Sequence, residues 1–211
     1  VVAPLIVGDK KIVYTCSIAR HIIIDLNICA EAPYELLLAG VGDMIGKYVA
    51  ILDWELSKKI TGEYYCEEIA DLIRSALKRC IDHADGLLKR EEAAVQAVFE
   101  GLVIGGVAMN YAGCSRPASG NENYISHIID MRAVEFGTAE DLHGIQCAMA
   151  TMKSVELYEK VMGYTPDWEK AHAYVQNFVL EDWNAQLRAF LGSSAETMID
   201  LEKKEGKYRK D

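Results

Sequence analysis

The segment AGVGDMIGKYVAILDWELS, residues 39–57, decides the fold class of this chain. Its apolar side chains recur with the 3.6-residue period of an α-helix, at Ile45, Val49, Leu52 and Leu56. Helical periodicity begins at Pro33, a residue that suits the first position of a helix. Gly62 predicts the end of this helix, because glycine readily adopts the left-handed conformation of a C-cap.

The same periodicity continues toward the C-terminus. It predicts further helices over residues 66–83, 90–112, 121–136, 142–162, 167–191 and 194–205. Ahead of Pro33, two β-branched runs, Lys11–Cys16 and His21–Leu26, predict two short strands within residues 10–26. We therefore expect a mainly α fold, with residues 33–205 almost wholly helical after a short β segment.

Composition and charge exclude several classes of protein. Of the 211 residues, 51% are hydrophobic and 26% are charged, as in globular proteins, and the formal net charge is −10. Such an acidic chain repels phosphate backbones, so we expect no nucleic-acid partner. The most apolar stretch, residues 93–113, contains Glu100 and several glycines, which favours a buried core helix over a membrane span.

The cysteines and the chain ends carry a second set of expectations. Six cysteines without a C-x-x-C motif exclude a zinc ribbon or a thioredoxin-type site and predict free thiols in a cytoplasmic protein. The chain begins without a charged, apolar leader, so no signal peptide is expected. It ends in a charged run, residues 202–211, without a stop signal, which suggests a piece of a longer protein.

The glycine-rich run at residues 40–47 does not satisfy a nucleotide-binding motif. A P-loop would need glycine at position 41 and Ser or Thr at position 48, which are Val41 and Tyr48. A dinucleotide fingerprint would need glycine where Ile45 stands. No other glycine-rich turn could seat a pyrophosphate, so we expect this chain alone to lack tight NAD binding and dehydrogenase activity.

Four polar residues are candidates for a metal site. Asp43 is expected in the first turn of its helix. An acidic residue there is favoured by the helix dipole, so the alternative to a metal ligand is a capping aspartate. Asn123 and His127 share one helix face, and His143 begins the next helix. An acid with two histidines could hold a divalent metal, whereas isolated histidines are usually structural.

A loop precedes the helix that carries Asn123. Residues 115–120, Ser-Arg-Pro-Ala-Ser-Gly, offer hydroxyls, the Arg116 guanidinium and backbone donors near a helix N-terminus. That combination suits an anion such as a phosphate. An ordinary capping loop remains the alternative.

Four motifs together, in order, resemble the glycerol-1-phosphate dehydrogenase family, within the iron-containing alcohol dehydrogenase and dehydroquinate synthase-like superfamily. They are the 39–57 segment, TGEYYC at 61–66, YAGCSRPASGNENYISH at 111–127 and LHG at 142–144. The resemblance covers residues 10–205. It implies a dehydroquinate synthase-like C-terminal helical domain over residues 31–211, truncated at both ends. Residues 1–30 would be the end of an N-terminal α/β domain that binds most of the NAD(P).

The resemblance also implies the site. The family's metal ligands fall on Asp43, Asn123 and His143, and His127 matches a histidine that contacts substrate. The family usually has histidine where this chain has Asn123, and an amide is a poor ligand for zinc. Three arrangements stay open: Asn123 ligates, His127 replaces it, or the site binds zinc, nickel or iron weakly. In each, Asp43, His127 and His143 should converge on one pocket.

The activity that the resemblance implies is reduction of dihydroxyacetone phosphate to glycerol 1-phosphate by NAD(P)H. The ion would polarise the carbonyl oxygen, with Asp43 and His127 as catalytic residues. Asp43 and His127 would also contact the substrate, and Arg116, chosen for its charge, would contact the phosphate of the substrate. The alternatives are a glycerol or polyol dehydrogenase, a dehydroquinate synthase-like cyclase, or a non-catalytic helical module that has lost its metal site. A homo-oligomer is compatible with all of them.

Overall fold

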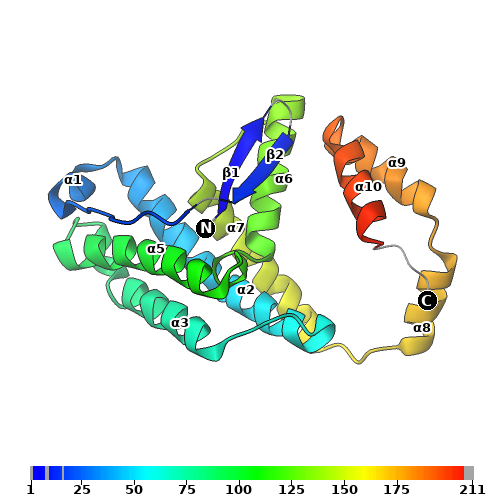
Figure 1. Ribbon diagram of the computed structural model, residues 1–211, viewed down its shortest axis with the longest axis horizontal. Helices are drawn as coiled ribbons and strands as arrows, with labels where there is room; N and C mark the ends of the chain where they lie inside the picture. The colour runs from blue at the N-terminus through cyan, green and yellow to red at the C-terminus, as the bar shows by residue number, and fades with distance from the viewer. Residues whose placement is uncertain (1, 8–9, 16, 207–211) are drawn as a thin grey trace.

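The computed structural model describes residues 2–7, 10–15 and 17–206, and it is mainly helical (Figure 1). Two antiparallel strands, β1 (Val2–Val7) and β2 (Lys10–Thr15), pair from Val2 opposite Thr15 to Val7 opposite Lys10. The helices follow in the order α1 (Leu26–Glu31), α2 (Tyr34–Thr61), α3 (Glu67–Asp82), α4 (Ala84–Leu87), α5 (Glu92–Ala112), the 3-10 turn η1 (Arg116–Ala118), α6 (Asn121–Phe136), α7 (His143–Met162), α8 (Trp168–Asn177), α9 (Leu180–Leu191) and α10 (Ser194–Glu205).

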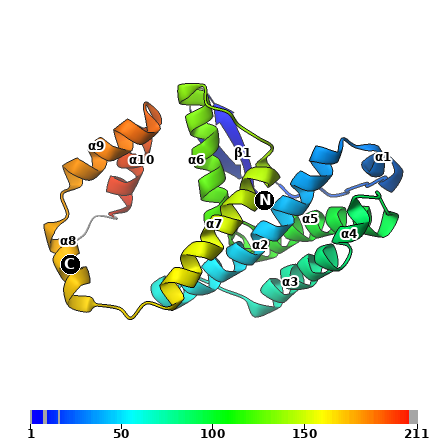
Figure 2. The same cartoon turned by 180° about the vertical axis from the view of Figure 1, so that it is seen from behind.

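The central helix α2 organises the bundle. It packs against α7 on one side and against α3 and α5 on the other, and α6 packs on α7 (Figure 2). The core is apolar, with Trp54 of α2 fully buried among Ile51, Ile73 and Ala108. The Trp54 indole nitrogen donates to the carbonyl oxygen of Tyr64 at 2.6 Å, which fixes the segment between α2 and α3. Gly62, with φ of 73°, ends α2 as predicted.

The predicted helix over residues 167–191 is wrong in one respect, because the structure divides it into α8 and α9. Phe178 is extended at the break, with φ of −64° and ψ of 125°. Its ring lies 6.5 Å from the rings of Tyr174 and Trp183, so an aromatic cluster forms where the two helices meet. These contacts join residues only four and five positions apart, so the cluster is local to the break.

Helices α8 to α10 form an arm that reaches back to α6 (Figure 1). Leu187 and Leu191 of α9 pack with Ala195 and Ile199 of α10, and Ile128 of α6 covers this cluster. The backbone nitrogen of Ser193 donates to Glu135 at 2.9 Å. The arm is therefore attached to the bundle through α6.

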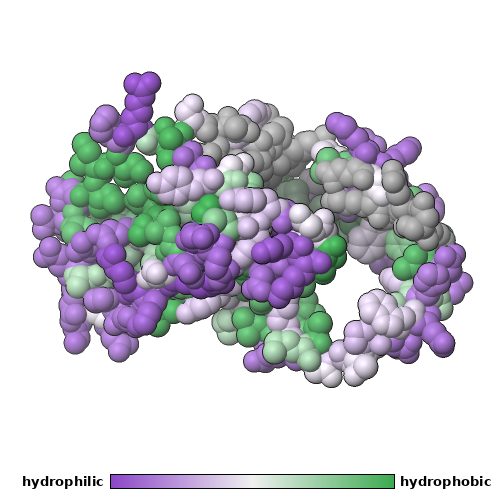
Figure 3. Space-filling view, turned by 60° about the horizontal axis from the view of Figure 1, so that its bottom comes forward, coloured by the Kyte–Doolittle hydropathy of each residue, from purple (hydrophilic) through white to green (hydrophobic). Residues whose placement is uncertain are grey.

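The strand predicted over His21–Leu26 is wrong. These residues form no strand, and α1 begins at Leu26 after the Asp25 side chain caps it. A strand needs a neighbour to complete its hydrogen bonds, and none of the described residues lies beside this run as a paired strand. Ile22 and Ile23 are 55% and 94% exposed, and apolar residues gather on the surface near α1 and the neighbouring part of α5 (Figure 3).

The other predicted strand is confirmed over Lys10–Thr15, while Cys16 lies outside the described residues. Its partner β1 was not expected.

Helix α5 is long and apolar enough to cross a membrane by length and composition alone, a test that buried core helices also pass. Here it packs against α1, α2, α3 and α4, and Val95, Val98 and Ala108 on it are buried. Of its most apolar 18-residue window 39% is buried, so the bundle covers α5 in part. The five cysteines in the described part of the chain, residues 29, 66, 80, 114 and 147, are thiols outside any disulfide, as predicted.

Candidate metal and substrate site

A cavity of about 240 Å³ opens between α2, α5, α6, α7 and the loop that contains η1. Four residues chosen from the sequence line it together: Asp43 from α2, Asn123 and His127 from α6, and His143 from α7. The described lining also includes Lys47, Ser115 and Ser119. Arg116 is not part of it. The convergence expected of Asp43, His127 and His143 is thus present in the structure.

Asp43 does not cap a helix. Because α2 begins at Tyr34, Asp43 lies in the helix interior, which corrects its expected place in the first turn. One turn later, Lys47 donates from Nζ to Asp43 Oδ1 at 3.0 Å. The Lys47 side chain is only 6% exposed, so this ion pair lies largely out of water. A lysine at i+4 from an aspartate was the signal in the sequence that could have revealed Lys47.

A chain of hydrogen bonds fixes the orientation of His143, the first residue of α7. The amide nitrogen of Gln146 donates to Asp130 Oδ1 and to the carbonyl oxygen of Asp141, each at 3.0 Å. Gln146 Oε1 therefore accepts the Ser126 hydroxyl at 2.6 Å. Because the Ser126 hydroxyl donates its proton to Gln146, Ser126 Oγ accepts a hydrogen bond from Nδ1 of His143 at 2.9 Å. This assignment puts the proton on Nδ1 and the lone pair on Nε2.

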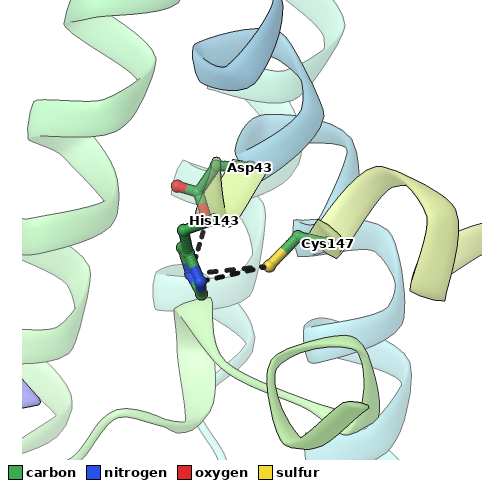
Figure 4. Close-up of side chains that lie close together, drawn as sticks. All are labelled: Asp43, His143 and Cys147. Carbon is green, nitrogen blue, oxygen red and sulfur yellow. Dashed lines mark hydrogen bonds and ion pairs between the residues drawn. The ribbon is translucent and has the colours of Figure 1, made fainter. Parts of the chain in front are cut away.

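Two other possible ligands lie close to Nε2 of His143. Its Nε2 lies 3.9 Å from Asp43 Oδ1 and 3.5 Å from Cys147 Sγ. Figure 4 shows the imidazole between the carboxylate from α2 and the thiol from the next turn of α7. One ligand atom from each of the three residues lies within 4.8 Å of the others. Cys147 was not chosen from the sequence, although its i+4 spacing from His143 places both on one helix face.

Asn123 is tied to a buried carboxylate. Its side chain is 8% exposed, and its Nδ2 donates to Glu122 Oε1 at 2.7 Å. Glu122 is fully buried, and the loss of water raises the pKa of its carboxyl group, although the backbone N–H of Gly120 and the charge of Lys47 oppose this shift. No residue pattern indicated that the Glu122 side chain points inward.

The loop before α6 presents hydroxyls rather than its arginine. Ser115 and Ser119 line the cavity, whereas Arg116 Nε donates to Glu63 Oε1 at 2.8 Å. The bond to Glu63 raises the pKa of the Arg116 guanidinium, so Arg116 stays charged and engaged there. The structure therefore does not bring Arg116 to the cavity with the other selected residues.

Asp53 anchors this loop to α2. The backbone nitrogen of Asn121 donates to Asp53 Oδ2 at 2.6 Å, and the Tyr158 hydroxyl donates to Oδ1. Burial raises the pKa of the Asp53 carboxyl group. A Cβ on Gly120 would lie 2.7 Å from Ala50 Cα, so only glycine lets the loop approach α2 this closely. The serines are thereby held at the cavity.

The donor set fits a divalent transition metal. Carboxylate oxygen, imidazole nitrogen and thiolate sulfur all bind zinc, and imidazole also suits nickel and iron. The outer hydrogen bond from Nδ1 to Ser126 is of the kind that orients metal-binding histidines. Asp43 and His143 would be the ligands that the sequence and the geometry share.

No protein-family model matches the chain. It is similar to curated glycerol-1-phosphate dehydrogenases (NAD(P)+) from several organisms. The relative from Bacillus velezensis is 37% identical over 175 residues, covering 80% of this chain and 44% of the relative. Those from Methanosarcina mazei and Thermococcus sibiricus are 42% and 44% identical, over 65% and 62% of this chain and 37% and 36% of their own lengths. The chain thus spans less than half the length of the relatives it matches.

Proposed function

Because the chain belongs to the glycerol-1-phosphate dehydrogenase family over the segment that it shares with these relatives, we propose that the full-length protein reduces dihydroxyacetone phosphate to glycerol 1-phosphate with NAD(P)H. The observation that carries the proposal is the meeting of Asp43, His127 and His143 in one cavity. In this proposal residues 31–211 form the metal- and substrate-binding domain, and residues 1–30 end the domain that binds NAD(P).

Asp43 and His143 would hold the ion in this proposal. When bound, a divalent metal acts as a Lewis acid that polarises the substrate carbonyl. The hydride adds to the carbonyl carbon and the oxygen takes a proton, so each turnover consumes one NAD(P)H and one proton. We assign that proton transfer to His127, which lines the same cavity.

The substrate phosphate needs donors that are available in the cavity. We assign it to the hydroxyls of Ser115 and Ser119 and to the Lys47 ammonium, because these groups line the cavity and Arg116 does not. The neutral serines and one lysine can bind a phosphate in a protein whose net charge is −10. The free cysteines support a cytoplasmic location for the enzyme.

The test is a substrate comparison with the full-length protein. NAD(P)H oxidation is followed with dihydroxyacetone phosphate, with unphosphorylated dihydroxyacetone and, in the reverse direction, with glycerol. We expect turnover with the phosphorylated ketone and its loss in Asp43→Ala. A preference for the unphosphorylated compounds would instead identify a polyol dehydrogenase, and absence of turnover with all of them would favour a non-catalytic module.

A further inference from the structure

We propose that Cys147 is a metal ligand, so that the ion is held by the carboxylate of Asp43, the imidazole of His143 and the thiolate of Cys147. This inference rests on the proposed metal site and identifies its third ligand. It replaces the assignment of the position-123 side chain as that ligand.

The separation of the sulfur and nitrogen atoms supports this ligand set. In tetrahedral zinc sites, Zn–S is about 2.3 Å and Zn–N about 2.0–2.1 Å, which separates the two ligand atoms by about 3.6 Å. Cys147 Sγ lies 3.5 Å from His143 Nε2. The corresponding nitrogen-to-oxygen separation is about 3.4 Å. Asp43 Oδ1 lies 3.9 Å from Nε2, about half an ångström beyond this separation, and ligand atoms of all three residues lie within 4.8 Å of one another.

The tautomer of His143 shows which of its ring nitrogens can bind the ion. Because Nδ1 is occupied by its bond to Ser126, the nitrogen that can coordinate is Nε2. Of the two ring nitrogens, Nε2 is also the closer to Cys147 Sγ, at 3.5 Å against 3.9 Å for Nδ1. The hydrogen-bond chain through Ser126 and Gln146 thus identifies Nε2 as the coordinating atom. Because Cys147 Sγ lies almost as close to Nδ1 as to Nε2, the ring must turn for the Nε2 lone pair to point at an ion between the thiol and Asp43.

Charge and ligand type favour Cys147 over Asn123. A thiolate adds one negative charge that helps to balance a divalent ion beside Asp43 and Lys47, whereas an amide oxygen contributes none. Cys147 is fully buried, and burying an ion is costly unless its charge is balanced. Asn123 is held by Glu122 through its amide nitrogen. Thiolate ligation also favours zinc or iron over magnesium or calcium.

Binding at Cys147 has a defined proton balance. The Sγ–H bond breaks, the sulfur–metal bond forms, and one proton passes to the solvent buffer without any change of oxidation state. Wild-type protein should therefore release one more proton on binding zinc than a variant that lacks the thiol.

The experiment uses cobalt(II) as a spectroscopic probe in the full-length protein. Cobalt bound to a thiolate gives a sulfur-to-metal charge-transfer band in the near ultraviolet, separate from the visible bands that report coordination geometry. Spectra are recorded for wild type, Cys147→Ser, Cys147→Ala and the matched control Cys80→Ser, which removes another buried thiol, one that donates to the carbonyl oxygen of Ala97. Zinc affinity and proton release are measured calorimetrically in buffers of different ionisation enthalpy.

We expect the charge-transfer band in wild type and Cys80→Ser and its loss in both Cys147 variants. Zinc affinity should fall more than about 100-fold in the Cys147 variants, beyond the 10- to 100-fold effect usual for outer-shell groups. Visible cobalt bands that depend on Asp43, without a band that depends on Cys147, would overturn this inference and leave the proposed metal site intact. Absence of any cobalt binding would overturn both.

Discussion

A Cβ atom on Gly42 would overlap the carbonyl oxygen of Gly144, so α2 and α7 cross with their backbones in direct contact. Each glycine adjoins a residue of the candidate site: Gly42 precedes Asp43 and Gly144 follows His143. The close crossing therefore brings the carboxylate and the imidazole to one cavity. Larger residues at either position would separate the helices and with them the two side chains.

Gly144→Ala should destabilise the protein severely. The new Cβ would overlap the carbonyl oxygen of Ala39 and lie 2.5 Å from its carbonyl carbon, and a backbone cannot move aside as a flexible side chain can. We expect a loss of about 3 kcal/mol or more in the free energy of unfolding, at or above the usual cost of overpacking. Urea unfolding measures it. Gly106→Ala is the control, since its Cβ meets nothing within 4 Å, and it should not destabilise α5. Equal stability of both variants would contradict the close crossing.

Asn123→His should strengthen zinc binding. It adds an imidazole nitrogen on the wall of the cavity that Asp43 and His143 share. A gain of about 1.4 kcal/mol, or tenfold in affinity, is expected, measured by competition with a chelating dye. The control Tyr124→His puts the same ring on the exposed side of α6, where Tyr124 is 59% exposed, and should leave the affinity unchanged. If position 123 is not close to the ion, both variants will bind zinc like wild type.

Ser126→Ala should weaken metal binding without removing a ligand. Loss of the hydroxyl frees His143 to rotate or change tautomer, because Nδ1 loses its 2.9 Å partner. The expected loss in zinc affinity is about 10- to 100-fold. Ser154→Ala is a matched control, because Ser154 is also buried and accepts a hydrogen bond, from Asn121. An affinity equal to that of wild type in Ser126→Ala would show that this bond does not orient the ring.

Glu122→Gln should change how stability depends on pH. Burial raises the pKa of the Glu122 carboxyl group in the folded state, so the folded protein binds more protons than the unfolded chain. The free energy of unfolding must then fall as pH rises from the ordinary glutamate pKa through the raised one. The neutral glutamine removes this slope. The free energy of unfolding of the variant should therefore rise relative to that of wild type as the pH becomes alkaline.

This comparison is made by urea unfolding with a chelator present, from mildly acidic to mildly alkaline pH. Glu159→Gln, on an exposed turn of α7, controls for the loss of one negative charge. A stability difference between Glu122→Gln and wild type that stays constant across this range would contradict the assignment.

Most of the helices could be predicted from the sequence, and the strands only in part. The apolar period over 39–57 identified α2, and Gly62 marked its end, because these are local properties of the chain. The run His21–Leu26 has the composition of a strand, yet strand formation depends on a partner elsewhere in the protein. The helical period did not predict the break at Phe178, although the aromatic contacts beside it join residues only four and five positions apart.

The residues of the candidate site were also predicted only in part from the sequence. Motifs were enough to choose four residues of the cavity, because spacing and residue type are properties of the sequence; these are Asp43, Asn123, His127 and His143. Arg116 was chosen for its charge, but its direction depends on Glu63, which lies 53 residues away.

The sequence by itself determined the helical period, the helix ends and the types of ligand available, because each depends on residues a few positions apart. Only the tertiary structure decided which of those ligands meet. The backbone contact between α2 and α7 brings Asp43 to His143, and the bond from Ser126 holds the ring beside Cys147. Both are contacts between helices, set by packing across the bundle, which the helical period of a single segment does not specify.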